Sequence, residues 1–366
     1  MSEICIDARM YNHSGIGKYL HMLLPYICRR FNVRLLGDMD VLSSLAQVST
    51  IIPFNAPIYS VAEQRQYRKI IGTTDIFWSP HYNVPLAGVM ASKKVVTIHD
   101  VYHLAFFKQL SLKQRIYAKM IMDNAVKKSD VIITVSDFSK SEIIKYTGCD
   151  SAKLNVIYNG VEEYSKPAGS AAVVTKYKLP QRYILFVGNV KPHKNLKTLI
   201  KSYLLLGEVQ QADFKVLIVG KKEGFLTGDH ELMNWVNGDS RLKDSIIFTG
   251  FVNDADLSTI YANAFLLVFP SAYEGFGLPP LEAMANGCPV IASDASSIPE
   301  VCGNAAIYFP AFDETQLSLK ISELLTNEFK RAEAIKRGYE RVKLFRWENS
   351  AGKHIKLFER LLEPEN

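Results

Sequence analysis

The sequence has no long hydrophobic run. Nowhere in its 366 residues does an apolar stretch reach the ~20 residues that a helix needs to span a bilayer. Its first residues, Met-Ser-Glu-Ile-Cys-Ile-Asp, include no basic region followed by an apolar core, which is the pattern of a secretory leader. We therefore expect a protein that neither spans a membrane nor is secreted.

Cysteine is scarce. The five cysteines show neither the short spacings of a zinc site nor the clustering of a disulfide framework, and they lie at Cys5, Cys28, Cys149, Cys288 and Cys302. A reducing cytoplasm is the compartment that fits this pattern.

The excess of positive charge is small. Lys and Arg number 43 against 37 Asp and Glu, and no zinc-finger, RNA-recognition or helix-turn-helix signature is present, so nucleic acid is not an expected partner. Residues 106–122 do concentrate basic side chains among aromatic and aliphatic ones, without an acid: Lys108, Lys113, Arg115 and Lys119. Two interpretations stay open. The segment lies on an anionic membrane surface, or it is the solvated face of an ordinary helix whose apolar side joins the core.

Short apolar strands alternate with amphipathic helices along the whole chain. The length predicts about two domains, and 48% hydrophobic with 22% charged residues is an ordinary globular mixture. Expected strands of a first α/β domain are residues 4–8, 33–36, 76–78, 94–98, 131–135 and 156–158, and those of a second are 183–188, 215–220, 246–250, 265–269 and 289–292. A polar, small-residue stretch at 162–172 predicts a linker. Two doubly wound domains facing a cleft are the expected architecture.

Two glutamates eight positions apart bracket the most informative segment. Glu274 is expected on the loop after strand 265–269, and Glu282 in the first turn of a helix opened by two prolines and closed by Gly287. A helix N-terminus suits an anion, while carboxylates accept hydrogen bonds from hydroxyls. A nucleotide-sugar makes both demands. The alternative is a solvated loop acid and a helix-start acid favoured by the dipole.

This segment resembles the donor-binding signature of retaining glycosyltransferases of family 4, which have the GT-B fold. The resemblance runs from Ile6-Asp-Ala-Arg-Met to Arg346-Trp347. It implies an N-terminal, acceptor-side Rossmann-like domain at 1–165, a C-terminal nucleotide-sugar-binding domain at 166–345, and a final helix at 346–366 that crosses back to the N-terminal domain. The family needs no metal and no cofactor, because the nucleotide-sugar donor is a substrate.

Further loops match the family in order and spacing. The loop after strand 183–188 carries Lys194 at the family's pyrophosphate-binding lysine, whereas Asn189 stands where the family usually has an arginine. His99 matches a histidine that lines the donor-sugar and acceptor site. The donor-binding set that the resemblance implies is completed by the glycine-rich loop, the nucleobase loop and the glutamate segment: Gly15, Gly17, Phe251, Val252, Glu274, Gly275, Phe276, Gly277, Leu278 and Glu282.

The resemblance also implies roles and a route. Glu274 orients the transferred sugar, Lys194 neutralises the leaving pyrophosphate and His99 contacts sugar or acceptor, which makes these three the candidate catalytic residues. Glu282 holds the ribose hydroxyls. Retention follows a front-face route in which the leaving pyrophosphate helps to deprotonate the incoming hydroxyl.

For several other polar residues we expect a structural role and no catalytic or metal-binding one. Asp38 with Asp40, and Asp254 with Asp256, have the spacing of a metal-binding aspartate pair but no further ligands nearby, so no metal site is expected. Residues 297–300, Ser-Ile-Pro-Glu, fit a capping box, and Ser136 or Ser139 is expected to cap a helix. Residues 79–85 follow a strand and are expected to shape the acceptor side.

Three further segments of the sequence narrow the choice of donor and acceptor. Residues 7–10, residues 60–64 and the Lys-Pro-His-Lys-Asn loop resemble bacterial mannosyltransferases that build O-antigen or other surface polysaccharide. They suggest GDP-mannose as donor and a lipid-linked glycan acceptor, handled at the cytoplasmic leaflet by a cytoplasmic or peripherally membrane-bound enzyme. UDP-sugars and GDP-fucose stay open as donors. So do a nucleotide-sugar epimerase of the same fold and a binding subunit without turnover.

Overall fold

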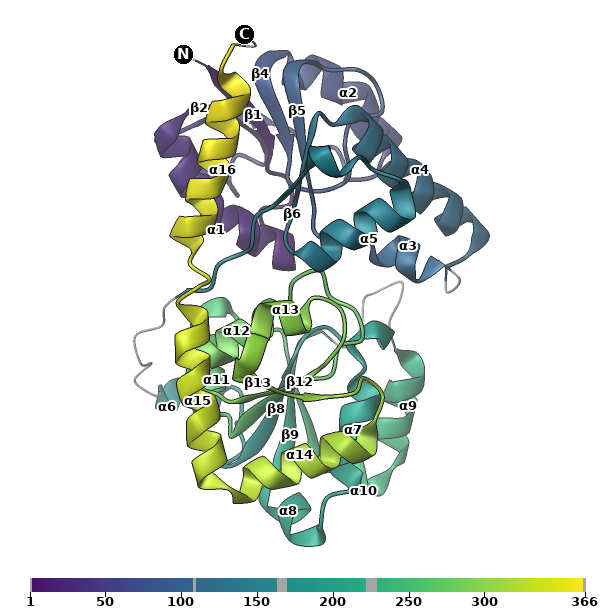
Figure 1. Cartoon of the computed structure of the whole chain (residues 1–366), viewed down its shortest axis with the longest axis vertical. Coiled ribbons are helices and arrows are strands. Elements are labelled where there is room, and N and C mark those ends of the chain that lie inside the picture. Colours follow the sequence, from purple (N-terminus) through teal and green to yellow (C-terminus); the bar gives the residue numbers. More distant parts are fainter. Residues whose placement is uncertain (1, 108–109, 163–169, 222–228, 365–366) are drawn as a thin grey trace. The chain divides into compact units, whose positions relative to one another are not determined.

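The computed structural model describes residues 2–107, 110–162, 170–221 and 229–364. The chain forms two compact units, shown in Figure 1. Unit 1 is Met1–Gly160 with Arg346–Asn366, and unit 2 is Val161–Phe345. Of the expected linker at 162–172, residues 163–169 lie outside the described residues, and Ala171 already begins a short helix.

Unit 1 is built on a parallel sheet of seven strands in the order β3-β2-β1-β4-β5-β6-β7. In chain order they are β1 (Glu3–Asp7), β2 (Asn32–Gly37), β3 (Thr50–Pro53), β4 (Thr73–Ser79), β5 (Met90–Ile98), β6 (Val131–Thr134) and β7 (Leu154–Val156). The strand order reverses between β1 and β4. Ligands of such sheets bind at the carboxyl ends of the strands on either side of that reversal.

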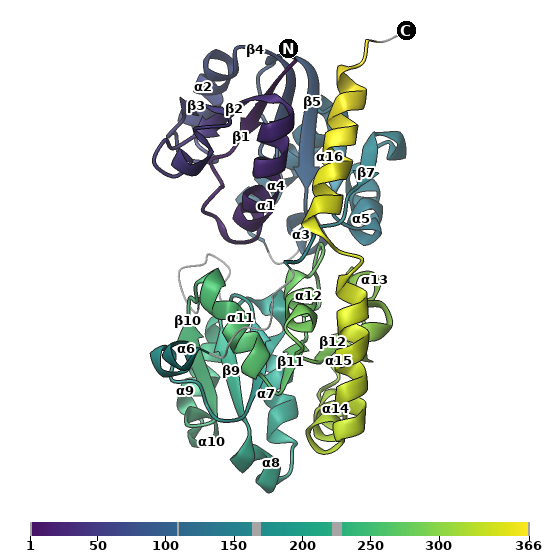
Figure 2. The same ribbon diagram turned by 90° about the vertical axis from the view of Figure 1, so that its left-hand side faces the viewer.

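The helices of unit 1 are α1 (Ser14–Arg30), α2 (Val61–Ile71), α3 (Tyr102–Ala105), α4 (Leu112–Lys128), α5 (Asp137–Thr147) and α16 (Trp347–Leu362). The last of these runs beside α1, as Figures 1 and 2 show. Its buried face repeats at helical spacing, with Trp347, Ala351, His354 and Phe358 turned to the core. Ser136 caps α5 by accepting a hydrogen bond from the Ser139 amide at 2.9 Å, so that prediction is confirmed.

Unit 2 is built on a parallel sheet of six strands in the order β10-β9-β8-β11-β12-β13. They are β8 (Tyr183–Val187), β9 (Lys215–Val219), β10 (Ile246–Gly250), β11 (Leu266–Phe269), β12 (Val290–Ser293) and β13 (Ala306–Phe309). The reversal of strand order falls between β8 and β11. The loops after these two strands therefore meet at the switch point of unit 2.

The helices of unit 2 are α6 (Ala171–Lys176), α7 (Leu196–Leu204), α8 (Glu208–Asp213), α9 (His230–Gly238), α10 (Ser240–Lys243), α11 (Asp254–Asn263), α12 (Leu278–Ala285), α13 (Ile298–Cys302), α14 (Glu314–Thr326) and α15 (Glu328–Val342). Side chains of the central strands, of α7 and of α14 form its main core. No helix in the described part of the chain is long and apolar enough to cross a membrane. All five cysteines are buried free thiols.

Three expectations about local structure are wrong. Strands β3 and β13 were not expected, and both are half-buried edge strands whose short sequences have little alternation. Helix α1 begins at Ser14, so Gly15 and Gly17 lie in its first turn and not in a loop before Lys18. Helix α12 begins at Leu278, ahead of its two prolines, which moves Glu282 from the first turn to the second.

Candidate active site at the switch point of unit 2

Lys194 and Glu274 form an ion pair at the switch point of unit 2. Lys194 follows β8 and Glu274 follows β11, and the Lys194 ammonium donates to Glu274 Oε1 at 2.6 Å. The side chains are 18% and 13% exposed, so both reach solvent at the carboxyl edge of the sheet. The Lys194 ammonium also lies 5.8 Å from the ring centre of Phe269, the last residue of β11. Two candidate catalytic residues, 80 positions apart, are thus brought together.

The loop that carries Lys194 is tied to the end of β11. Lys194 closes a short 3-10 turn, Pro192–Lys194, and the next residue, Asn195, is left-handed with φ of 53°. The buried Asn195 amide donates to the Pro270 carbonyl at 3.1 Å, and the Ala272 amide donates to the His193 carbonyl at 2.8 Å. These bonds fix the separation of the two loops, and therefore the geometry of the ion pair.

Two serines hold the Glu274 loop, and one of them, Ser297, was expected to cap a helix instead. Ser296 Oγ accepts the Glu274 amide at 3.0 Å, and the fully buried Ser297 Oγ lies 3.0 Å from both the Glu274 and the Phe276 carbonyl oxygens. The capping box expected at 297–300 is therefore wrong, because the Ser297 side chain makes no cap bond to α13. A hydroxyl can serve a local cap or a distant loop, and sequence spacing alone cannot tell these apart.

Glu282 is held inside the same region by a tyrosine. It is 6% exposed, and its Oε2 accepts a hydrogen bond from the buried Tyr261 hydroxyl of α11 at 2.9 Å. Glu282 lies on α12, whose N-cap residue is Gly277. This glycine has a positive φ of 93°. Pro279 and Pro280, the second and third residues of α12, have no N–H group, so the backbone donors that favour an anion at this helix start are those of Gly277 and Leu278.

Asn189 and the nucleobase loop lie after the neighbouring strands. Asn189 Oδ1 accepts the backbone amide of Lys221 at 3.2 Å, which joins the loops after β8 and β9. A side chain on Gly220 would collide with the Gly188 carbonyl oxygen at 2.2 Å, so these loops require glycine to approach so closely. After β10, Phe251 is 65% exposed with the Lys221 ammonium 5.9 Å from its ring centre, and Val252 is buried.

In unit 1, His99 and the glycines lie at the carboxyl edge of the sheet. The His99 Nε2–H donates to the Pro80 carbonyl at 3.0 Å, because a carbonyl oxygen can only accept. Burial holds the pKa of His99 below its usual range, so the ring is neutral with Nδ1 as its acceptor. A side chain on Gly17 would meet the Tyr11 carbonyl oxygen at 2.4 Å, whereas Gly15 has open space around its Cα.

Known proteins resemble this chain over most of its length. The family model described as Glycosyltransferase Family 4 matches residues 13–163, and the model described as Glycosyl transferases group 1 matches residues 173–341. The O-antigen chain mannosyltransferase B of Escherichia coli is 32% identical over 302 residues, which cover 81% of this chain and 76% of the relative. The O-antigen chain mannosyltransferase RfbU of Salmonella typhimurium is 30% identical over 80% of this chain and 77% of its own. This chain is a family 4 glycosyltransferase.

Solved structures show the fold of this glycosyltransferase to be GT-B. Sucrose-phosphate synthase from Thermosynechococcus elongatus superposes with a TM-score of 0.78 at 18% identity, covering 99% of each chain. WaaG, a glycosyltransferase involved in lipopolysaccharide biosynthesis, superposes with a TM-score of 0.75 at 16% identity, covering 98% of this chain and 99% of its own. The expected fold class and family are confirmed.

The two aspartate pairs of the glycosyltransferase have structural partners. Asp38 Oδ1 accepts the amides of Asp40 and Val41 in a turn. Asp256 accepts from the Lys176 ammonium and the Tyr177 hydroxyl at 2.7 and 2.9 Å. Within the residues that the structure describes, no three His, Cys, Asp or Glu side chains gather as metal ligands would.

Proposed function

We propose that this glycosyltransferase is a retaining mannosyltransferase that moves mannose from GDP-mannose to a lipid-linked glycan in surface-polysaccharide synthesis. The observation that carries the proposal is the 32% identity, over 81% of the chain, to a protein named as an O-antigen mannosyltransferase. UDP-sugars or GDP-fucose remain the alternative donors. An epimerase and a binding subunit without turnover remain the alternative functions.

The Lys194–Glu274 pair supports the roles proposed for both residues. An ammonium has three donors, and one goes to Glu274 Oε1. The remaining donors reach a pyrophosphate, whose negative charge grows as the sugar leaves, so Lys194 stabilises the transition state more than the ground state. The pairing directs the Glu274 side chain toward the same point, where its carboxylate orients the hydroxyls of the transferred sugar.

We propose that Glu282 binds the nucleoside. Its Oε2 accepts a hydrogen bond from the Tyr261 hydroxyl, which directs the carboxylate, and carboxylate oxygens are suitable acceptors for ribose hydroxyls. We assign it the ribose hydroxyls, with the exposed Phe251 ring and the backbone of Val252 beside the base. Asn189 is assigned a structural part in this site, because its Oδ1 already accepts the Lys221 amide. In this proposal Lys194 binds the pyrophosphate without the arginine that the family usually has at position 189.

His99 suits contact with a hydroxyl of sugar or acceptor. The neutral ring is oriented by the Pro80 carbonyl, and the edge of Tyr19 packs against it with ring centres 4.9 Å apart. A neutral imidazole whose Nε2 is committed as a donor offers Nδ1 as an acceptor. Gly15, in the first turn of α1, adds a backbone donor that favours a phosphate, whereas the Gly17 amide donates to the His13 carbonyl.

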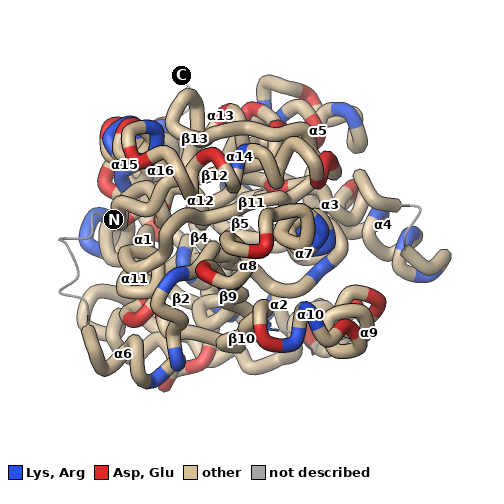
Figure 3. Tube along the Cα trace, turned by 90° about the horizontal axis from the view of Figure 1, so that it is seen from below, with Lys and Arg blue, Asp and Glu red and all other residues tan. Residues whose placement is uncertain are grey.

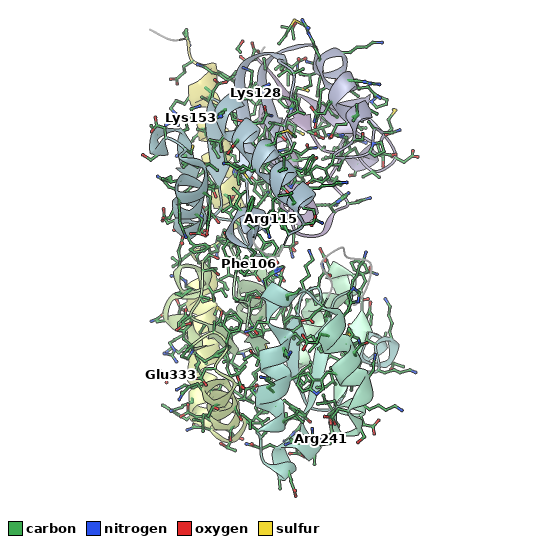
Figure 4. The ribbon with its side chains drawn as sticks, turned by 90° about the vertical axis from the view of Figure 1, so that its right-hand side faces the viewer. Phe106, Arg115, Lys128, Lys153, Arg241 and Glu333 are labelled. Carbon is green, nitrogen blue, oxygen red and sulfur yellow. The ribbon has the colours of Figure 1, made fainter. Side chains whose placement is uncertain are left out.

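Helix α4 carries the features of a membrane contact. Leu112, Ile116 and Met120 are 71%, 63% and 47% exposed, and their spacing of four places them on one face of the helix. Lys113 and Lys119 are exposed on the same helix, whose basic positions appear in Figure 3, while Arg115 is labelled in Figure 4. An ordinary surface helix would turn such residues to the core, so this exposure supports peripheral binding to an anionic membrane. The predicted contact Lys108 lies outside the described residues.

A thermal-shift screen of nucleotides tests the donor. A ligand at 100 times its dissociation constant stabilises the folded state by about 2.7 kcal/mol. We expect GDP and GDP-mannose to raise the melting temperature more than UDP and UDP-glucose. The reverse order would remove the mannosyl assignment and leave a glycosyltransferase that uses a UDP-sugar.

Product analysis separates the alternative functions. A transferase consumes GDP-mannose only as fast as the acceptor is glycosylated, apart from slow hydrolysis. Conversion of the donor into a second nucleotide-sugar without acceptor would identify an epimerase. Donor binding with no product under any acceptor would identify a binding subunit.

A further inference from the structure

Four rings from three segments of unit 1 gather at the carboxyl edge of its sheet. They are Tyr59, His81, Tyr82 and Tyr117, here called the aromatic platform. The ring centre of Tyr59 lies 5.8, 6.4 and 6.4 Å from those of His81, Tyr82 and Tyr117, and His81 and Tyr82 are 3.9 Å apart. Tyr59 and Tyr117 are 42% and 40% exposed. The site therefore presents aromatic surface to solvent where β4 ends.

A buried ionic network holds this surface in place. Glu63, fully buried, accepts hydrogen bonds on Oε1 from Arg9 at 2.6 Å, Asn83 at 2.7 Å and Tyr67 at 3.1 Å. Arg9 also pairs with Asp7 at 2.6 Å. Burying two carboxylates and one guanidinium away from water is costly unless each is bonded, as they are here.

The network ends on Tyr59 itself. Glu63 Oε2 accepts the backbone amide of Tyr59 at 2.8 Å, and Tyr59 is left-handed with φ of 67°. A bulky residue in that conformation costs on the order of 1–2 kcal/mol, and such strain persists where surrounding bonds impose it. Its hydroxyl lies 3.2 Å from His81 Nε2. The bond to Glu63 therefore holds Tyr59 in a strained backbone conformation, and its ring is exposed to solvent.

The charged groups beside the platform are paired with one another. A small pocket reaches from His81 to the buried network, and its lining includes Asp7 and Arg9, which form an ion pair, as well as the uncharged Met10, Ser79 and Asn83. Burial lowers the pKa of His81 to about 3, so this ring carries no charge at neutral pH. Among the described residues, the buried Asn83 Oδ1 has no hydrogen-bond partner. Aromatic faces beside a neutral histidine and an amide oxygen without a partner suit a hydroxylated ring that has one apolar face.

We propose that the aromatic platform binds a sugar ring of the acceptor glycan, one or more residues away from the sugar that is modified. The apolar face of a pyranose stacks on the ring of Tyr59, and the Tyr117 ring, which is inclined by 79° to that of Tyr59, contacts the edge of the sugar. The sugar hydroxyls meet His81 and Asn83. Tyr117 lies on α4, the helix whose exposed apolar residues support membrane contact, so a glycan attached to a lipid would pass this surface. The proposal rests on the proposed transfer to a lipid-linked glycan.

The test uses a variant that removes the ring without straining the chain. In Tyr59→Gly the amide that donates to Glu63 is kept and the left-handed backbone becomes favourable, so the melting temperature should stay level or rise. Phe312→Gly is the matched control, because Phe312 is a 63% exposed ring at φ of 73° in unit 2. Tyr117→Ala is a second variant that leaves the strained position untouched.

Binding of α-mannotriose and chitotriose is measured by saturation-transfer NMR and titration. We expect the wild-type protein to receive saturation transfer on the ring C–H protons of at least one trisaccharide. Tyr59→Gly and Tyr117→Ala should each weaken that binding about tenfold, and Phe312→Gly should not, with GDP affinity equal in all four proteins. Wild-type affinity in both variants, or no trisaccharide bound by the wild-type protein, overturns the platform. Platform-dependent binding together with no transfer from GDP-mannose would instead overturn the proposed function alone.

Discussion

Lys194 is the residue whose removal separates binding from chemistry. Because pyrophosphate gains negative charge as the glycosidic bond breaks, Lys194→Ala should lower kcat by about 100-fold and weaken donor affinity much less. Glu274, only 13% exposed, also loses its ionic partner in this variant. Steady-state kinetics with a direct measurement of donor affinity checks the prediction, and a melting curve shows whether the variant is folded.

A second lysine provides the control. Lys197 lies three positions later on α7 and pairs with Glu231 at 2.8 Å, but these side chains are 43% and 83% exposed. Exposed pairs contribute little, so Lys197→Ala should change kcat and affinity by less than about twofold. Equal losses of kcat and donor affinity in Lys194→Ala would mean uniform binding, and would contradict its role at the leaving group.

At the residue scale, motif positions were predictable and their partners were not. Glu274 and Glu282 were identified from the pattern of strand, loop and helix around them, and Lys194 was identified from the resemblance of its loop to that of the family. Ser297 was assigned to a local cap, yet it holds the glutamate loop from another element. Its true acceptors lie 21 and 23 positions away in sequence, a separation over which no periodicity operates.

Helix α16 is anchored to unit 1 by a histidine that must stay neutral. His354 is fully buried, its Nδ1–H donates to the Ser350 carbonyl at 2.8 Å, and its Nε2 accepts from the Tyr19 hydroxyl at 2.6 Å. Burial lowers the pKa of His354 to about 4. The unfolded chain, with an ordinary pKa near 6.5, therefore binds the proton first as the pH falls.

Stability should accordingly fall between pH 6.5 and pH 4. The unfolded state binds more protons in this window, so the free energy of unfolding rises with pH, and at pH 5 this one group has cost about 2 kcal/mol. His354→Gln keeps a donor and an acceptor but does not titrate. Its melting temperature should depend less steeply on pH between 6.5 and 5 than that of the wild-type protein. An unchanged slope would show that His354 is not the group responsible.

At the element scale, central strands were predictable and edges were not. Strands such as β8 and β11 are buried on both faces and appear as continuous apolar runs. Edge strands β3 and β13 have fewer buried residues, and β3 ends in a proline. The start of α1 was placed four residues late because glycine favours loops. Gly17 is in fact required inside the helix, by the close approach of the Tyr11 backbone.

At the scale of the whole molecule, both units place candidate residues at the point where strand order reverses. In unit 2 this point holds the Lys194–Glu274 pair, and in unit 1 it holds the Asp7–Arg9–Glu63 network beside the aromatic platform. Alternating strands and helices were enough to predict two doubly wound sheets. They were not enough to predict the network, since Glu63 lies on α2, 54 positions from Arg9 in sequence.

The proposed membrane contact of unit 1 gives the last prediction. Each basic residue near an anionic surface adds on the order of 1 kcal/mol, and surface charges are screened beyond roughly 10 Å at 0.1 M salt. We expect reversible binding to vesicles of anionic lipid that weakens with salt, measured by co-sedimentation. Replacing Lys108, Lys113, Arg115 and Lys119 with glutamine should reduce it at least tenfold, while GDP binding stays unchanged.

Two further variants separate the contribution of this helix from that of total charge. Replacing the exposed Leu112, Ile116 and Met120 with serine should also release the protein, because their apolar surface no longer enters the headgroup layer. The matched control replaces four exposed lysines of unit 2 with glutamine: Lys201, Lys243, Lys330 and Lys343. It changes the net charge by the same amount, so it should leave vesicle binding nearly intact. Equal loss in this control would attribute binding to net charge, and binding that survives every change on α4 would make that helix an ordinary solvated surface.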